Sequence, residues 1–205
     1  MRLARLATVM LLALPLTACG YNQIQSLDEK AEQAKSNIGV QLTARNQLIP
    51  NLVATVKGAA GFERGTFTDV AKARSGQALA GAEQGLRQAQ QQVDQAVASK
   101  NVQQMQQADA AVTRQIGTFI NVAREAYPNL QATQNFRGLQ DQLAESENRI
   151  AVARQDYNES VKNYNTYIRS FPQAITARVT GAQRKEPYQA PAGSEAAPTV
   201  DFNKP

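Results

Sequence analysis

Residues 135–171 read NFRGLQDQLAESENRIAVARQDYNESVKNYNTYIRSF, and this stretch decides the fold. Its apolar side chains recur every three or four residues, which is the spacing of one face of an α-helix. The pattern predicts one helix from about Asn135 to Phe171, roughly 55 Å long at 1.5 Å per residue, which ends at Pro172. The residues of the stripe are Phe136, Leu139, Leu143, Ile150, Tyr157, Val161, Tyr164, Ile168 and Phe171.

Further helical patterns precede this stretch. An apolar stripe runs from Tyr21 to Val56, and Pro50 inside it predicts a kink or a break. The Ala- and Gln-rich residues 76–101 and the following run to Tyr127 form either one long helix or two helices joined near Lys100-Asn101. Long helices with a single apolar stripe must pack lengthwise against each other. The sequence therefore predicts an all-α fold: an elongated antiparallel bundle of three to four long helices.

The N-terminus is typical of a bacterial lipoprotein signal peptide. Arg2 and Arg5 precede a short apolar run, Leu6–Leu14, which is about half of the roughly 20 residues that a membrane-spanning helix needs. The residues Leu16-Thr17-Ala18-Cys19 form a lipobox, which predicts cleavage after residue 18 and a diacylglycerol group on Cys19. An ordinary secretory cleavage beside an incidental cysteine is the alternative. Gly20, rather than Asp, after the cysteine predicts the outer membrane, facing the periplasm.

The composition argues against several classes of protein. The chain has no His and one Cys, so it lacks the commonest general base, a disulfide and the usual metal-ligand spacings. Without residues 1–18, 20 basic residues stand against 17 acidic ones, a net charge of +3 with no basic cluster that would indicate nucleic-acid binding. No glycine-rich phosphate loop is present in a strand-turn-helix setting. We therefore expect no catalysis, no metal, no cofactor and no nucleic-acid partner.

Several polar side chains lie close to the predicted core. On an ideal helix four of them fall within about 40° of one another and border the apolar stripe of residues 135–171; they are Glu147, Arg154, Asn158 and Asn165. Arg45 lies inside the apolar stripe of the first helix, where an unpaired charge is costly. We expect it to pair with Glu147 or to hydrogen-bond Asn158, which would fix the register of two helices.

Two other interpretations of these residues remain open. Arg45 either extends its stem along the core so that its charge reaches water, or it lines a ligand groove together with the polar stripe. Asn51, which follows Pro50, is expected to bond the carbonyl that the proline leaves free.

Many short stretches of this sequence follow one another in a distinctive order and spacing. They are Arg45–Val53, Thr55–Gly58, Ala73-Arg74, Tyr127–Ala132, Asn135-Phe136, Leu139-Gln140, Leu143, Glu147–Ala151, Arg154, Tyr157-Asn158, Val161, Tyr164-Asn165, Phe171-Pro172, Pro187-Tyr188 and Val200-Asp201-Phe202. Together these stretches resemble the LemA family. The resemblance implies a helical fold with an exposed soluble domain, and little about activity. Many members keep an uncleaved N-terminal transmembrane helix, whereas this chain has a lipobox.

These observations together predict three segments and a function. We expect a signal peptide over residues 1–18, a LemA-like helical domain over residues 19–185 and a flexible Pro- and Ala-rich tail over residues 186–205. The predicted function is that of a non-enzymatic, lipid-anchored envelope protein that acts as an interaction module for other envelope proteins. Its membrane contact is the lipid on Cys19, and residues 76–101 are the expected docking face. The alternatives are a structural spacer that self-associates or contacts the cell wall, and a holdase-like chaperone.

Overall fold

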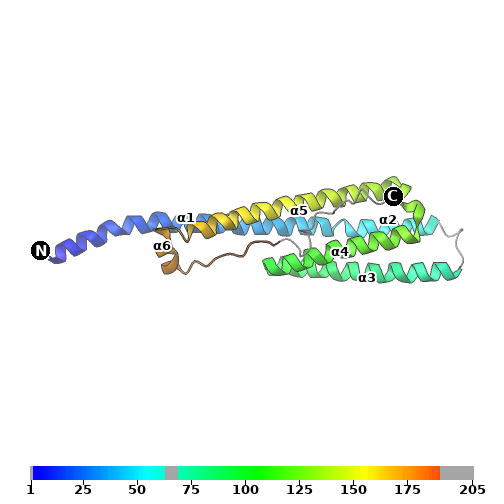
Figure 1. Ribbon diagram of the computed structural model, residues 1–205, viewed down its shortest axis with the longest axis horizontal. Helices are drawn as coiled ribbons and strands as arrows, with labels where there is room; N and C mark the ends of the chain where they lie inside the picture. Colours follow the sequence, from blue (N-terminus) through cyan, green and yellow to red (C-terminus); the bar gives the residue numbers. More distant parts are fainter. Residues whose placement is uncertain (1, 63–68, 190–205) are drawn as a thin grey trace, which may run out of the picture. The chain divides into compact units, whose positions relative to one another are not determined.

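The computed structural model describes the backbone of residues 2–62 and 69–189, and the side chains of residues 20–59 and 75–189. All regular structure in these residues is helical, so the predicted all-α class is confirmed (Figure 1). The side chain of Cys19 and the stretch Val200-Asp201-Phe202 lie outside the described residues. The elements are α1 (Arg2–Asn46), α2 (Ile49–Phe62), α3 (Asp69–Ser99), α4 (Val102–Ala126), η1 (Pro128–Ala132), α5 (Gln134–Tyr167) and α6 (Gln173–Thr180).

The chain divides into two compact units. Unit 1 comprises Met1–Gln41 and Asn148–Pro187, and unit 2 comprises Leu42–Glu147 and Tyr188–Pro205. Both α1 and α5 contribute residues to each unit, so each unit is assembled from segments that are far apart in the sequence.

The helical run through Pro50 is broken rather than kinked. α1 ends at Asn46 and α2 begins at Ile49, which makes Pro50 the second residue of the new helix. A proline in the first helical turn costs little, because its missing N–H would have no partner within the helix. Backbone hydrogen bonds stabilise the turn between the two helices. The Gln47 N–H donates to the Thr43 carbonyl at 3.1 Å, and the Leu48 N–H donates to the Arg45 carbonyl at 3.0 Å.

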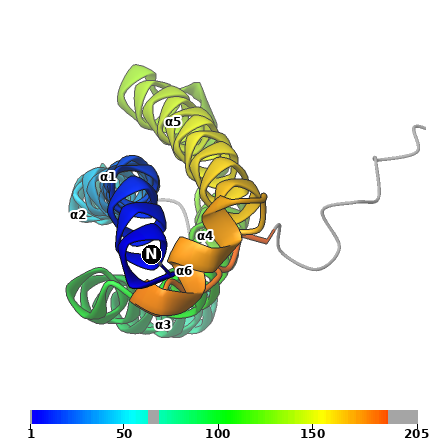
Figure 2. The same cartoon turned by 90° about the vertical axis from the view of Figure 1, so that its left-hand side faces the viewer.

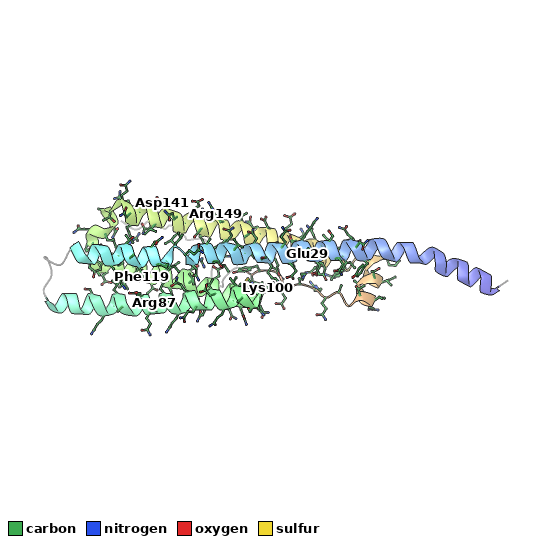
Figure 3. The ribbon with its side chains drawn as sticks, turned by 180° about the vertical axis from the view of Figure 1, so that it is seen from behind. Glu29, Arg87, Lys100, Phe119, Asp141 and Arg149 are labelled. Carbon is green, nitrogen blue, oxygen red and sulfur yellow. The ribbon has the colours of Figure 1, made fainter. Side chains whose placement is uncertain are left out.

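In unit 2, α3 and α4 are separate helices that pack against each other (Figure 1). Lys100, with a φ of 53°, reverses the chain between them. The side chain of Asn101 then caps α4 by accepting a bond of 3.0 Å from the Gln104 N–H. The buried face of α4 includes Phe119, labelled in Figure 3. The thin buried stripe of α3 consists of Leu79, Ala82, Leu86, Ala89, Val93 and Ala96.

In unit 1, α6 packs against the middle of α1 and the end of α5 (Figures 1 and 2). Its core consists of Ile24, Tyr164, Ile168 and Ala177. Gly181 ends α6 in the left-handed conformation, with a φ of 71° that favours glycine.

The sequence pattern did not predict α6, and it extended the preceding helix too far. We expected that helix to continue to Phe171 with this side chain buried, and that expectation was wrong. α5 ends at Tyr167, and Phe171 is 84% exposed. The physical reason is that the chain turns before Pro172 and begins α6 in a new direction, so residue 171 leaves the stripe on which Ile168 still lies.

Candidate functional site

Unit 2 contains a buried ionic network centred on Arg45. This side chain is 2% exposed and comes from the last turn of α1. Its Nη2 donates to Oδ1 of Asp109 on α4 at 2.7 Å, and its Nη1 donates to Oε2 of Glu147 on α5 at 2.7 Å. Nη1 also donates to Oγ1 of Thr113 at 3.1 Å. One guanidinium group therefore bonds two carboxylates from two other helices.

The network ties the C-terminal segment to the helices. Tyr188 is buried, and its hydroxyl donates to Oδ2 of Asp109 at 2.7 Å. Asp109 thus accepts one bond on each carboxylate oxygen, from Arg45 and from Tyr188. We expected a flexible tail from residue 186 onward, whereas the structure places Tyr188 in the interior of unit 2.

The structure places the sequence-predicted polar residues as follows. Arg45 and Glu147 are in contact, which is the first of the two pairings that we considered. Asn51 is exposed on α2, while backbone N–H groups of Gln47 and Leu48 close the helix break. The remaining predicted residues, Arg154, Asn158 and Asn165, are half-buried on the part of α5 that belongs to unit 1.

Asn165 holds an extended segment of unit 1 that follows α6. Its Nδ2 donates to the Lys185 carbonyl at 2.8 Å, and its Oδ1 accepts from the Lys185 N–H at 2.9 Å. The Tyr157 hydroxyl adds a third bond, of 2.9 Å, to the Glu186 carbonyl. An extended segment has no internal hydrogen bonds of its own, so these contacts supply the partners that its backbone needs.

The side chain of Lys185 forms the centre of a second charged cluster. Its Nζ lies 2.7 Å from Oε1 of Glu32 and 3.1 Å from Oδ1 of Asp28, both on α1. It also lies over the ring of Tyr164, 5.5 Å from the centroid, as in a cation–π contact. These contacts attach the segment after α6 to α1.

In this cluster, burial and ion pairing shift the pKa of each charged group in opposite directions. Burial alone would raise the pKa of the Glu32 carboxyl, but hydrogen bonds from Lys185 and Lys35 outweigh it and lower that pKa. Burial alone would lower the pKa of Lys185, but hydrogen bonds to Glu32 and Asp28 outweigh it and raise that pKa. Both shifts favour the charged forms, so the paired state is the stable one near neutral pH.

Hydrogen bonds from the side-chain amides of Asn46 and Gln90 fix the end of α1 to α3. Nδ2 of the buried Asn46 donates to the Gln90 carbonyl and to Oδ1 of Asp94, both at 3.1 Å. Nε2 of Gln90 donates in return to the Asn46 carbonyl at 3.1 Å, which satisfies the last carbonyl of α1.

One exposed side of α3 consists mainly of glutamines and is called the glutamine face below. Five glutamines project within about 60° of one another on an ideal helix, and all five are exposed. Among the described side chains of α3, the charged residues Glu83, Arg87 and Asp94 lie to one side of this face. Glu83 bonds Lys57 of α2 and Arg87, which is labelled in Figure 3, and Asp94 bonds Asn46. The glutamines are Gln77, Gln84, Gln88, Gln91 and Gln95.

Two open grooves border this part of unit 2. One, of about 420 Å³, is mainly apolar and is lined by α2 residues such as Pro50 and Val53 and by α3 residues such as Arg87. The other, of about 280 Å³, is lined by glutamines of α3 and α4, among them Gln95 and Gln104. The second groove is continuous with the glutamine face, because Gln95 belongs to both.

Sequence reasoning missed Asp109, Lys185 and the buried role of Tyr188. Asp109 had a detectable signal, since it follows Met105 by four residues and therefore lies on the apolar face of α4. A carboxylate there indicates a partner for the buried Arg45. Lys185 and Tyr188 lie in an extended segment without apolar periodicity, so no comparable signal marks them in the sequence.

The described part of the chain contains neither a metal cluster nor a membrane-spanning helix. Among the described residues, no three His, Cys, Asp or Glu side chains are grouped so that they could hold a metal ion. Of the helices in the same residues, none has an apolar stretch long enough to cross a membrane.

The chain is thus an all-helical protein whose C-terminal segment is bonded back to its long helices through Tyr188 and Lys185. The sequence profile of the LemA family matches residues 34–202, which include both of these side chains and Arg45. The chain belongs to the LemA family.

Three curated relatives are similar over most of the chain. Magnetosome proteins MamQ 1 and MamQ 2 of Paramagnetospirillum magneticum are each 29% identical over 181 residues, and magnetosome protein MamQ of Magnetospirillum gryphiswaldense is 27% identical over 181 residues. Each alignment covers 84% of this chain and 66% of the relative. The chain therefore spans about two thirds of the length of these relatives.

Proposed function

We propose that this chain is a lipid-anchored envelope protein, held at the periplasmic side of the outer membrane through Cys19, whose helices dock other envelope proteins without catalysis. The observation that carries the docking role is the glutamine face of α3. The lipobox Leu16-Thr17-Ala18-Cys19 supports the anchor. In this proposal the helices form the elongated antiparallel bundle that the sequence predicts, and the bundle presents the face along its length.

The spacing of this face suits a helical partner. Residues 77, 81, 84, 88, 91, 95 and 98 follow one another at alternating intervals of four and three, and five of them are glutamines. This interval corresponds to the 3.5-residue repeat with which two helices keep one seam in contact. The other two positions hold Gly81 and Ala98, which are small enough to let a partner backbone approach.

The chemistry of the face suits docking at a low desolvation cost. A glutamine amide offers both donors and an acceptor, so it can exchange water for the polar groups of a partner. No charge has to be buried, because Glu83, Arg87 and Asp94 lie beside the face and are bonded to other groups of unit 2. A partner helix with glutamine, asparagine or serine at its own seam would complement the face.

In-cell photocrosslinking tests the docking role. A photoreactive residue in place of Gln88 should give a defined adduct with an envelope protein, whereas the same residue in place of the exposed Gln142 on α5 should not. The adduct should be lost when Gln84→Glu and Gln91→Glu place two carboxylates at the seam. A control with Gln131→Glu and Gln155→Glu adds the same charge at exposed positions elsewhere and should retain the adduct.

The outcome separates the proposal from its main alternative. Adducts of the chain with itself, or with cell-wall fragments, would instead support a structural spacer that self-associates or contacts the wall. An absence of adducts specific to position 88 would refute docking at this face. Replacement of Cys19 by Ala should abolish the membrane fraction of the protein, which tests the anchor separately.

A further inference from the structure

α6 and the turn before it carry a concentrated group of exposed apolar side chains. Phe171 is 84% exposed, Ile175 58% and Val179 82%. Ile175 and Val179 are four residues apart, so they lie on the same side of α6. Large apolar side chains that are this exposed and this close together mark a contact surface more often than isolated ones do.

The opposite side of α6 is fixed to unit 1. Ala177 is buried with Ile24 and Tyr164, and Gly181 ends the helix with the Ala182 N–H bonded to the Ala177 carbonyl at 2.9 Å. The orientation of α6 is therefore set by its packing, and the exposure of the apolar side chains follows from it.

α6 lies beside the residue that follows the lipidation position. A Cβ atom added to Gly20 would lie 3.4 Å from Oγ1 of Thr176 on α6. Figures 1 and 2 both show α6 next to α1 in this region. Cys19 directly precedes Gly20, and consecutive Cα atoms are about 3.8 Å apart. A lipid on Cys19 would therefore bring the bilayer surface to α6.

The charged residues of the chain segment that contains α6 are all basic. No Asp or Glu occurs from residue 169 to residue 185. Arg169, Arg178 and Arg184 are exposed, whereas Lys185 is engaged by the carboxylates of Glu32 and Asp28. Three exposed guanidinium groups in the same segment as the exposed apolar side chains complement anionic lipid headgroups, which attract basic residues at a membrane surface.

We propose that α6 is a membrane-contact helix that lies in the headgroup region of the bilayer, with Phe171, Ile175 and Val179 inserted among the lipids. The proposal rests on the proposed lipid anchor at Cys19. The diacylglycerol group predicted on Cys19 carries two acyl chains, which are enough for a stable anchor. The contact of α6 would instead fix the direction in which α1 leaves the membrane, because one short flexible linkage cannot.

The absence of tryptophan from the chain allows a direct test. The full-length chain with Val179→Trp is produced in bacteria, and the mature protein is reconstituted into vesicles of phosphatidylethanolamine and phosphatidylglycerol. Mass spectrometry first establishes whether Cys19 is acylated. The emission of the tryptophan in the Val179→Trp variant should shift to shorter wavelength and be strongly quenched when the acyl chains carry bromine.

Val40→Trp is the matched control. Val40 is an exposed valine on α1, 59% exposed and about 30 Å along the helix from Gly20. Its tryptophan should emit as in water and escape quenching. Circular dichroism of both variants verifies that each retains the helical fold.

Each result bears on the proposal. An unquenched Val179→Trp variant on an acylated protein would overturn the role of α6 and leave the anchor intact. Equal quenching of the two variants would also overturn it, because the contact would not belong to α6. A chain without a lipid would refute the anchor, and quenching of the Val179→Trp variant by added vesicles would then decide the role of α6 independently.

Discussion

Tyr188 donates a hydrogen bond of 2.7 Å to Asp109, a residue 79 positions earlier in the chain. Asp109 uses its other oxygen for Arg45, at 2.7 Å. A buried carboxylate is tolerated when both of its oxygens have donors. The C-terminal segment therefore completes the polar core of unit 2, and loss of that segment should weaken the whole unit.

Replacement of Tyr188 by Phe should lower the free energy of unfolding. The change removes one hydrogen bond to a buried charged group, which is worth about 2 kcal/mol. For a chain of this size the melting temperature should fall by roughly 4–8 °C. Thermal unfolding followed by circular dichroism measures the change. Tyr21→Phe, at an exposed position, should be almost neutral; equal effects of the two substitutions would contradict the role of the Tyr188 hydroxyl.

Replacement of Arg45 by Met should destabilise the protein by about 3–5 kcal/mol, because it leaves Asp109 as a buried carboxylate without its cation. The double variant Arg45→Met/Asp109→Leu should recover a large part of the loss, since it removes both buried charges. Urea titrations of the single and double variants measure this coupling.

An exposed arginine provides the control for this series. Arg124→Met on α4 should change the free energy of unfolding by no more than about 0.5 kcal/mol. If Arg45→Met were as stable as the wild type and kept the fold, the network would have no part in fixing the register of α1, α4 and α5.

The apolar stripes predicted most of the helices, because burial of one face leaves a regular spacing in the sequence. Ile24, Leu42, Leu52 and Ile150 are all buried as that spacing requires. The ends of the helices were harder to predict. The break at Gln47-Leu48 precedes Pro50, because proline fits the first turn of a new helix better than the interior of an old one.

The candidate site was only partly predictable for a related reason. Arg45 stood out because a charge interrupted an apolar stripe, and this interruption pointed to a partner. Tyr188 and Lys185 are held by contacts to distant residues, and an extended segment carries no period that would indicate such contacts. The short helix α6 has one small buried side chain, Ala177, so its packing left little trace in the sequence.

Replacement of Asn165 by Ala should release the segment after α6. The substitution removes both bonds to the Lys185 backbone, each worth about 1 kcal/mol. Cleavage by trypsin after Arg184 should accelerate by roughly 10- to 30-fold, if it follows the population of the open segment. Asn163→Ala, at an exposed position on the same helix, should leave the rate unchanged. Equal rates for both variants would show that other contacts hold the segment.

The ion pairs of Lys185 should make stability depend on pH at both extremes. Glu32 has a pKa below its ordinary value of 4.5 in the folded protein, so its contribution is present above 4.5 and is lost as the pH falls through the lowered pKa. Lys185 has a pKa above its ordinary value of 10.5, so its contribution is present below 10.5 and is lost as the pH rises through the raised pKa.

Lys185→Met tests this dependence. The difference in free energy of unfolding between wild type and Lys185→Met should be constant from about pH 6 to pH 9 and should shrink outside that window on both sides. Urea titrations across the pH range measure it. Lys162→Met removes an exposed lysine of α5, and its difference in free energy of unfolding from wild type should stay near zero at every pH. A difference for Lys185→Met that does not change with pH would mean that the lysine stabilises unit 1 through its packing on Tyr164 rather than through its charge.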